Sequence, residues 1–175
     1  MDAINCLMTR RSVRTFLDKK ISEKDIETIL KAGIEGPTAL NKQDIHIRAI
    51  TNKDWLNKME NVIKDALHSD GYKLGYHAPL FIVIRGDKNN WLTVRNGGAI
   101  TENVLLCAHA LGLGSVWINQ LNTPEVQDRE DYKELLKEAG IPANYEVVAS
   151  VAIGYNASNE PISKPRKPGL TTILK

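Results

Sequence analysis

Apolar residues recur every three or four positions in several parts of the chain, a pattern that predicts amphipathic helices. The segments with this spacing are residues 4–8, 26–30, 55–67, 90–111 and 124–140. Ser22 and Asp25 form a capping signature before the second helix, which we expect to end near residues 33–37. The last helix should begin with Thr123 as its cap and Pro124 as its first helical residue, and it should stop at Gly140. The segment 90–111 also carries small residues that permit close packing, so it is expected to be the central helix.

Strand-like segments separate these helices. Residues 45–50 (IHIRAI) alternate between apolar and polar. This pattern predicts a strand with one face exposed to solvent or covered by a partner. Residues 80–84 (LFIVI) form a continuous apolar run, which is typical of a strand buried on both faces. Residues 116–118 predict a short strand and residues 146–153 a longer one. Helices and strands thus combine in one domain that covers residues 1–175.

The end of the chain differs from the rest. Residues 155–175 contain the proline-spaced stretch EPISKPRKPGLTTILK, which predicts an extended arm with little to bury against within its own chain. We expect this arm to cross a second copy of the same protein in a homodimer.

Composition narrows the class of protein. Apolar residues make up 42% and charged residues 25% of the 175, the usual balance of a soluble globular protein, and no apolar run is long enough to span a bilayer. The net charge of +2 argues against nucleic-acid binding through the field of the whole chain. Cys6 and Cys107 lie in apolar helical contexts without a C-x-x-C motif or a signal peptide, so free thiols in the cytoplasm are expected.

Several common chemistries lack their motifs. The four histidines show no spacing typical of a metal site, so no metal is expected. Ser115 lacks the glycine that would complete a nucleophile elbow. The glycines of residues 112–114 end a helix and precede a strand, which is the reverse of a dinucleotide-binding fingerprint, so a helix C-cap explains them better.

The stretch RRSVRTF, residues 10–16, is the strongest candidate for a binding site. Arg10, Ser12 and Arg14 would point to the same side of an extended segment, with Val13 toward the core and Arg11 away. Two guanidinium groups and a hydroxyl suit a phosphate monoester. A solvated surface, or arginines paired with acidic residues for little net stability, is the competing interpretation.

In the order and spacing of its features the chain resembles the FMN-dependent nitroreductases. The resemblance rests on RRSVRTF, GPTALNKQDIHI, AHALGLGSVWI, VASVAIGY and the tail motif KPRK, and covers nearly the whole chain. It implies an α+β fold in which helices flank a mostly antiparallel central sheet. It also implies a homodimer with FMN at the subunit interface and the C-terminal arm exchanged.

The resemblance also implies cofactor-binding residues. The segment with Arg10, Arg11, Ser12 and Arg14, together with Lys164 and Arg166 of the tail, would hold the FMN phosphate and ribityl chain. Two further segments would contact the flavin, one of them from the other subunit. The other subunit would supply Pro37, Thr38, Ala39 and Asn41, and the segment along the flavin ring would be Trp117, Ile118 and Asn119.

The implied activity is an NAD(P)H oxidoreductase, in which NADH or NADPH reduces FMN and a nitro, quinone or similar electrophilic acceptor reoxidises it in a ping-pong cycle. Because the flavin carries the hydride, no catalytic side chain is expected, although Arg14 or Lys73 would stabilise the charge of reduced flavin. Other flavin reactions on the same fold (dehalogenation, dehydrogenation or flavin breakdown) and a non-enzymatic flavin-binding or basic-arm interaction protein remain alternatives.

Two features limit the resemblance. Residues 43–45 read Gln-Asp-Ile where many members have Gln-Pro-Trp, and the chain has no room for the helical insertion that covers the cleft of larger relatives. A more open pocket is therefore expected. The stretch 68–77, with Gly71 and Gly75, is the best candidate for a mobile cover.

Overall fold

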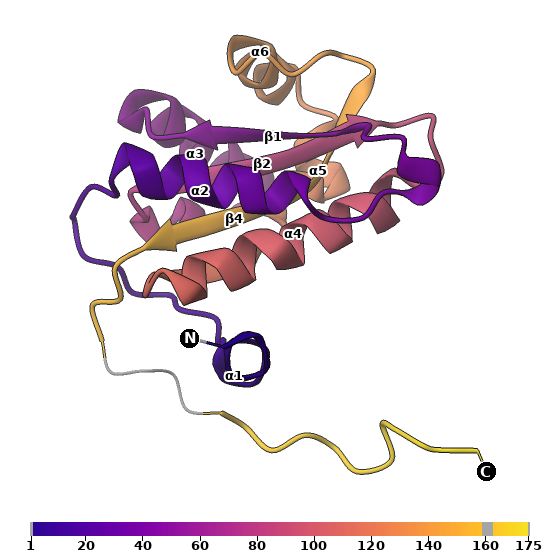
Figure 1. Cartoon of the computed structure of the whole chain (residues 1–175). Coiled ribbons are helices and arrows are strands. Elements are labelled where there is room, and N and C mark those ends of the chain that lie inside the picture. The colour runs from indigo at the N-terminus through magenta and orange to yellow at the C-terminus, as the bar shows by residue number, and fades with distance from the viewer. Residues whose placement is uncertain (1, 159–162, 175) are drawn as a thin grey trace.

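The structure is a computed structural model that describes residues 2–158 and 163–174. Its centre is an antiparallel sheet of four strands in the order β1-β2-β4-β3 (Figure 1). The strands are β1 (Ile45–Ile50), β2 (Leu80–Asp87), β3 (Gly114–Ile118) and β4 (Tyr145–Gly154). All four lie where the hydrophobic pattern predicts a strand, and the predicted α+β fold with an antiparallel sheet is confirmed.

Helices cover both faces of the sheet (Figure 1). The α-helices are α1 (Ala3–Thr9), α2 (Glu23–Ile34), α3 (Lys53–Leu67), α4 (Thr93–Ala110), α5 (Pro124–Gln127) and α6 (Glu130–Glu138). Helices α2 and α4 bury their apolar sides against one face, and α3, α5 and α6 cover the other. Between the two cores, residues 80–84 are at most 1% exposed, as a continuous apolar run predicts.

The helix ends follow from local chemistry. Ser22 accepts a hydrogen bond from the Asp25 N–H, as predicted. Helix α4 ends in a Schellman motif, in which Gly112 adopts a φ of 77° and the Leu113 N–H bonds to the Ala108 carbonyl. This confirms the helix-cap interpretation of the glycines in residues 112–114.

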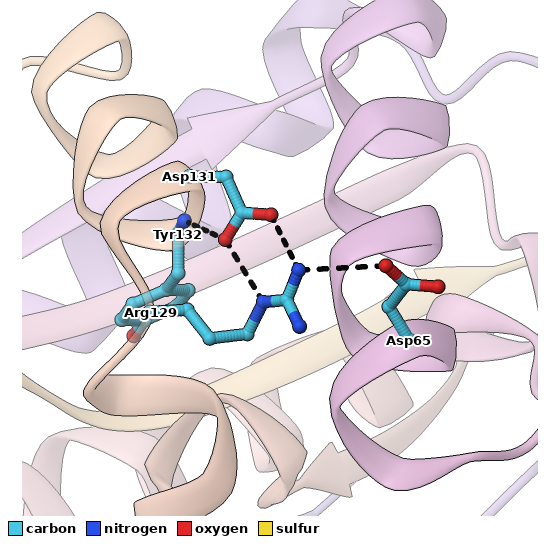
Figure 2. A network of polar contacts seen from close by, with 4 residues as sticks. All are labelled: Asp65, Arg129, Asp131 and Tyr132. Atoms are coloured by element: carbon cyan, nitrogen blue, oxygen red, sulfur yellow. Dashed lines mark hydrogen bonds and ion pairs between the residues drawn. The ribbon is translucent and has the colours of Figure 1, made fainter.

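The predicted helix 124–140 is wrong as a single element, because the structure breaks it at residues 128–129 into α5 and α6. Figure 2 shows the polar contacts that Arg129 makes at this break. The Arg129 guanidinium bonds both carboxylate oxygens of Asp131 at 2.9 and 2.7 Å, reaches Asp65 of α3 at 3.5 Å, and holds the pKa of the Asp131 carboxyl below its usual range. The backbone of Arg129 is extended, so α6 starts anew. Thr123 lies at the start of α5 as predicted but forms no side-chain cap, since its hydroxyl donates to the Gln120 carbonyl.

Candidate functional site

The arginine-rich segment 10–16 is attached to the edge of the sheet. Ser12 forms a parallel bridge with Ser115 of β3, and the Val13 N–H donates to the Ser115 carbonyl at 2.9 Å. The Val13 side chain is buried, as predicted, and packs on Gly114. Phe16 forms a second bridge, to Asn156 just after β4. Two isolated bridges therefore tie the backbone of this segment to β3 and to the chain just after β4.

The polar side chains of this segment differ in what they bind. Arg10 lies 3.4 Å from Glu102 of α4, and Arg11 donates to the Arg10 carbonyl. Ser12 and Arg14, in contrast, form no side-chain hydrogen bond or ion pair with any residue in the ranges 2–158 and 163–174. A free hydroxyl and a free guanidinium on a segment anchored by its backbone fit an anionic group such as a phosphate.

The loop before β1 is strained. Leu40, Asn41 and Gln43 all have positive φ values of 52–56°, which non-glycine residues rarely adopt. The Thr38 hydroxyl accepts the Gln43 N–H, and the Asn41 amide oxygen accepts the Gln43 side-chain amide. Such strain gathers at ligand and switch sites and persists only where the surroundings enforce it.

A buried side-chain amide on α4 holds this loop in its strained conformation. Asn96 is 5% exposed, and its Oδ1 accepts the Ala39 N–H at 3.1 Å. Its Nδ2 donates to Asp44, which also accepts a 2.6 Å bond from Asn90. Asp44 thus joins the loop to α4. Sequence reasoning missed Asn96, although its place four residues before Ile100 on the buried side of α4 was a signal.

The three candidate residues at the end of β3 differ in how exposed their side chains are. Trp117 is 38% exposed on the edge strand, and Asn119 is exposed just after it. Ile118 is 5% exposed, its side chain packs in the core, and its carbonyl accepts the Ser150 hydroxyl. Trp117 therefore offers the aromatic surface at this edge.

The stretch 68–77 is anchored at one point by Glu60 of α3. Glu60 accepts bonds from Lys64, from the Leu74 N–H and from His77. Burial alone raises the pKa of Glu60, but these bonds outweigh it and leave the pKa below its ordinary value of 4.5. No pattern in the sequence indicated this contact.

The tail begins on the chain's own N-terminal segment. The Ala157 N–H donates to the Thr15 carbonyl, and the Thr15 hydroxyl donates to Ser158. Residues 159–162 of the predicted arm lie outside the described residues. Residues 163–174, with Lys164 and Arg166, are exposed and extend past α1 away from the sheet (Figure 1). The two cations do not contact Arg10 in the described structure of one chain.

The candidate site is an open surface in a single chain. A groove of about 850 Å³ lies between α6 and the start of β4, and a smaller one of about 490 Å³ lies along β1. Neither is lined by a candidate residue of the flavin site. Close to the candidate residues the surface is apolar instead, with Ile4, Met8, Leu40 and Trp91 between 69% and 88% exposed.

Two further features are absent from the part of the chain that the structure describes. No three His, Cys, Asp or Glu side chains gather there as a metal ion requires. In the same ranges no helix has the length and apolar character to cross a membrane.

Known proteins are similar to this chain over most or all of its length. A nitroreductase from Bacteroides fragilis, solved with bound FMN, is 30% identical with a TM-score of 0.93, and each chain covers 100% of the other. An Archaeoglobus fulgidus protein, provisionally named an NADH dehydrogenase/NAD(P)H nitroreductase, is 34% identical over 88% of this chain and 85% of its own. The NADPH-flavin oxidoreductase of Vibrio harveyi is 25% identical over 98% of this chain and 72% of its own. The model of the nitroreductase family matches residues 7–155, and the chain belongs to that family.

Proposed function

We propose that this protein is an NAD(P)H-dependent FMN oxidoreductase that reduces nitro, quinone or similar electrophilic acceptors. The observation that carries the proposal is the free Ser12 hydroxyl and Arg14 guanidinium on a segment fixed to β3 beside the exposed Trp117. The FMN-bound relative and the NAD(P)H-dependent activities in the relatives' names support the choice of cofactor and reductant.

In this proposal the two ends of one chain bind the FMN phosphate together. Arg10, Ser12 and Arg14 approach it from the N-terminal segment, and Lys164 and Arg166 from the tail. The backbone bond between Ala157 and Thr15 supports this pairing, because it starts the tail next to the segment.

A second copy of the chain completes the site. Large apolar side chains are exposed on α1, in the loop before β1 and at the start of α4, and their burial against a second copy supports a homodimer. The partner's strained loop, residues 37–41, then approaches the flavin, and the tail beyond Arg166 lies over the partner. The absence of candidate residues from either groove of the single chain fits a site closed by two chains.

When bound, FMN accepts a hydride from NADH or NADPH and passes it to the acceptor in a ping-pong cycle. The chain itself binds and orients the cofactor. Arg14, or Lys73, places positive charge where reduction adds negative charge. Trp117 borders the ring, and the open surface admits acceptors of varied shape. The free thiols Cys6 and Cys107 are consistent with a place in the cytoplasm.

Purified protein tests this proposal. We expect it to be yellow, to release FMN on denaturation, and to bleach when NADH or NADPH is added under nitrogen, with colour restored by a quinone or nitroaromatic. Protein that holds FMN but is not bleached would favour another flavin reaction on this fold. Colourless protein that cannot be reconstituted with FMN would contradict the flavoprotein assignment.

A further inference from the structure

We propose that Arg48 and Arg85, with His46 beside them, form a second anion-binding site that takes a phosphate group. The three side chains come from the paired strands β1 and β2. Strand β1 is one edge of the sheet, and β3, which carries Trp117, is the opposite edge. The cluster is therefore separate from the proposed flavin residues on β3 and the arginine-rich segment, and the inference goes beyond the proposed function.

The two guanidinium groups meet at the turn just after α6. Arg85 donates from Nη1 to the carbonyl of Gly140. An added Cβ on Gly140 would lie 2.7 Å from Nη2 of Arg48, so this second guanidinium packs against the same glycine. The φ of Gly140 is 71°, in the left-handed region that favours glycine. The absence of a side chain at this turn thus gives both cations room.

A histidine and a tyrosine complete the cluster. His46 is the cross-strand partner of Arg85, so the two side chains are neighbours on one face of the sheet. His46 Nε2 is hydrogen-bonded to the Tyr145 hydroxyl at 3.0 Å. The Arg85 guanidinium lies 5.7 Å from the centroid of the Tyr145 ring, within the range of a cation–π contact. These contacts fix the position of Arg85 and place an imidazole next to it.

Neither arginine has a carboxylate partner. Arg48 forms no ion pair or hydrogen bond, and Arg85 no ion pair, with any residue in the ranges 2–158 and 163–174. The Nε of Arg85 is buried and has no acceptor in those ranges. Burial, and then the charge of Arg48, lower the pKa of the Arg85 guanidinium below its ordinary value. Two like charges with unused donors are unfavourable, and a bound anion would offset this cost.

A groove beside the cluster has room for such an anion. The groove of about 490 Å³ along β1 is lined by all three basic residues. The other charged side chains in its lining, Glu27 and Lys31, lie 3.9 Å apart and balance each other, so the groove carries the excess charge of the two arginines. A phosphate monoester is close to a dianion at neutral pH and accepts bidentate bonds from guanidinium groups. Its charge therefore matches that of the site.

The rest of the groove indicates what the phosphate group is attached to. Ligand pockets commonly combine an apolar lining with a few polar groups that fix the orientation of the ligand. The other residues that line this groove are apolar: Leu30, Ile34, Ile45 and Ile47. A phosphate ester with a small apolar part is therefore expected to bind more tightly than the free ion.

Calorimetric titration tests the inference on protein saturated with FMN, so that the proposed flavin-phosphate site is already occupied. The probes are inorganic phosphate and butyl phosphate at constant ionic strength. We expect both to bind, with butyl phosphate about tenfold tighter because its chain is buried against the apolar lining. Equal affinities would still support a phosphate site, but with the free ion as its ligand.

Three variants locate the binding. Arg48→Met and Arg85→Met keep an unbranched apolar side chain and remove the guanidinium, and each should weaken phosphate binding about tenfold, the usual effect of losing a charged hydrogen bond. Arg95→Met is the matched control. It removes an exposed arginine of α4 that bonds the Trp91 carbonyl, and it should leave phosphate affinity unchanged.

Thermal unfolding gives a second measurement if Arg85→Met does not fold. The Arg48 side chain is exposed, so Arg48→Met should fold. Added phosphate should raise the unfolding temperature of wild type more than that of Arg48→Met, because a ligand stabilises the state that binds it.

Wild type that binds neither probe, or an affinity that Arg48→Met leaves unchanged, would overturn the inference while the proposed function stands. Protein that holds no FMN would count against the proposed function alone, because the dependence of phosphate binding on Arg48 can be measured without the cofactor.

Discussion

Val13 lies directly over Gly114, so closely that a Cβ on Gly114 would come within 2.7 Å of Val13 Cγ1 and 2.9 Å of Cγ2. Through this contact and the neighbouring bond from the Val13 N–H to the Ser115 carbonyl, β3 sets the position of Ser12 and Arg14. Gly114 thus sets the position of Ser12 and Arg14, two residues that we propose contact the FMN phosphate.

Gly114→Ala should displace the segment that carries Ser12 and Arg14. Overpacking of this size costs about 1–3 kcal/mol, so we expect a lower unfolding temperature and FMN affinity at least tenfold weaker. Calorimetry and fluorescence titration measure the two effects. Gly71→Ala is the control, because a Cβ there meets nothing within 4 Å. Equal FMN affinity in the two variants would contradict the role of this contact.

Asp44→Ala should loosen the loop before β1. Asp44 accepts amide bonds from Asn90 and Asn96, and Asn96 in turn holds the Ala39 N–H. Leaving these partly buried amides without an acceptor should lower the free energy of unfolding by about 1–3 kcal/mol, measured by urea denaturation. Asp70→Ala, at an exposed aspartate, serves as the reference. If both variants lose the same stability, Asp44 does not fix the loop.

The Glu60 carboxylate should make stability depend on acid pH. Its pKa lies below 4.5 in the folded protein, so the folded state binds fewer protons than the unfolded state. Its contribution is therefore complete above about pH 4.5 and is lost as pH falls through the lower folded value. The stability difference between wild type and Glu60→Gln, measured by denaturation from pH 7 to 3, should shrink in acid. A difference that stays constant over this range would show that the carboxylate charge is not involved.

The sequence predicted the sheet and most helices because burial imposes a period on the apolar residues. The apolar run in β2 is buried on both faces of the sheet, and the apolar side of α4 packs into the core. Few polar residues are tolerated at such positions. The break between α5 and α6 was missed because it depends on Arg129 reaching Asp131 and Asp65, and Asp65 lies 64 residues away. No local pattern contains such a contact.

Some features of the candidate site could likewise be predicted from the sequence and others could not. The inward direction of Val13 and the position of the arginines on an extended segment follow from alternation and were predictable. The left-handed residues around Leu40 and Tyr76 were not, because Asn96 and Glu60 enforce them from distant helices. The meeting of Arg166 with Arg10 stays a prediction, since it depends on how the tail folds back in the proposed dimer.

The most direct test of the central claim compares FMN with riboflavin, which lacks the phosphate, in wild type, Arg10→Ala and Arg166→Ala. If both ends of the chain bind the phosphate, wild type prefers FMN strongly. Each variant then loses about 2 kcal/mol of FMN affinity, the usual value of a charged hydrogen bond, while riboflavin affinity stays unchanged. Wild type that binds the two flavins equally, or variants that weaken both to the same extent, would contradict the claim.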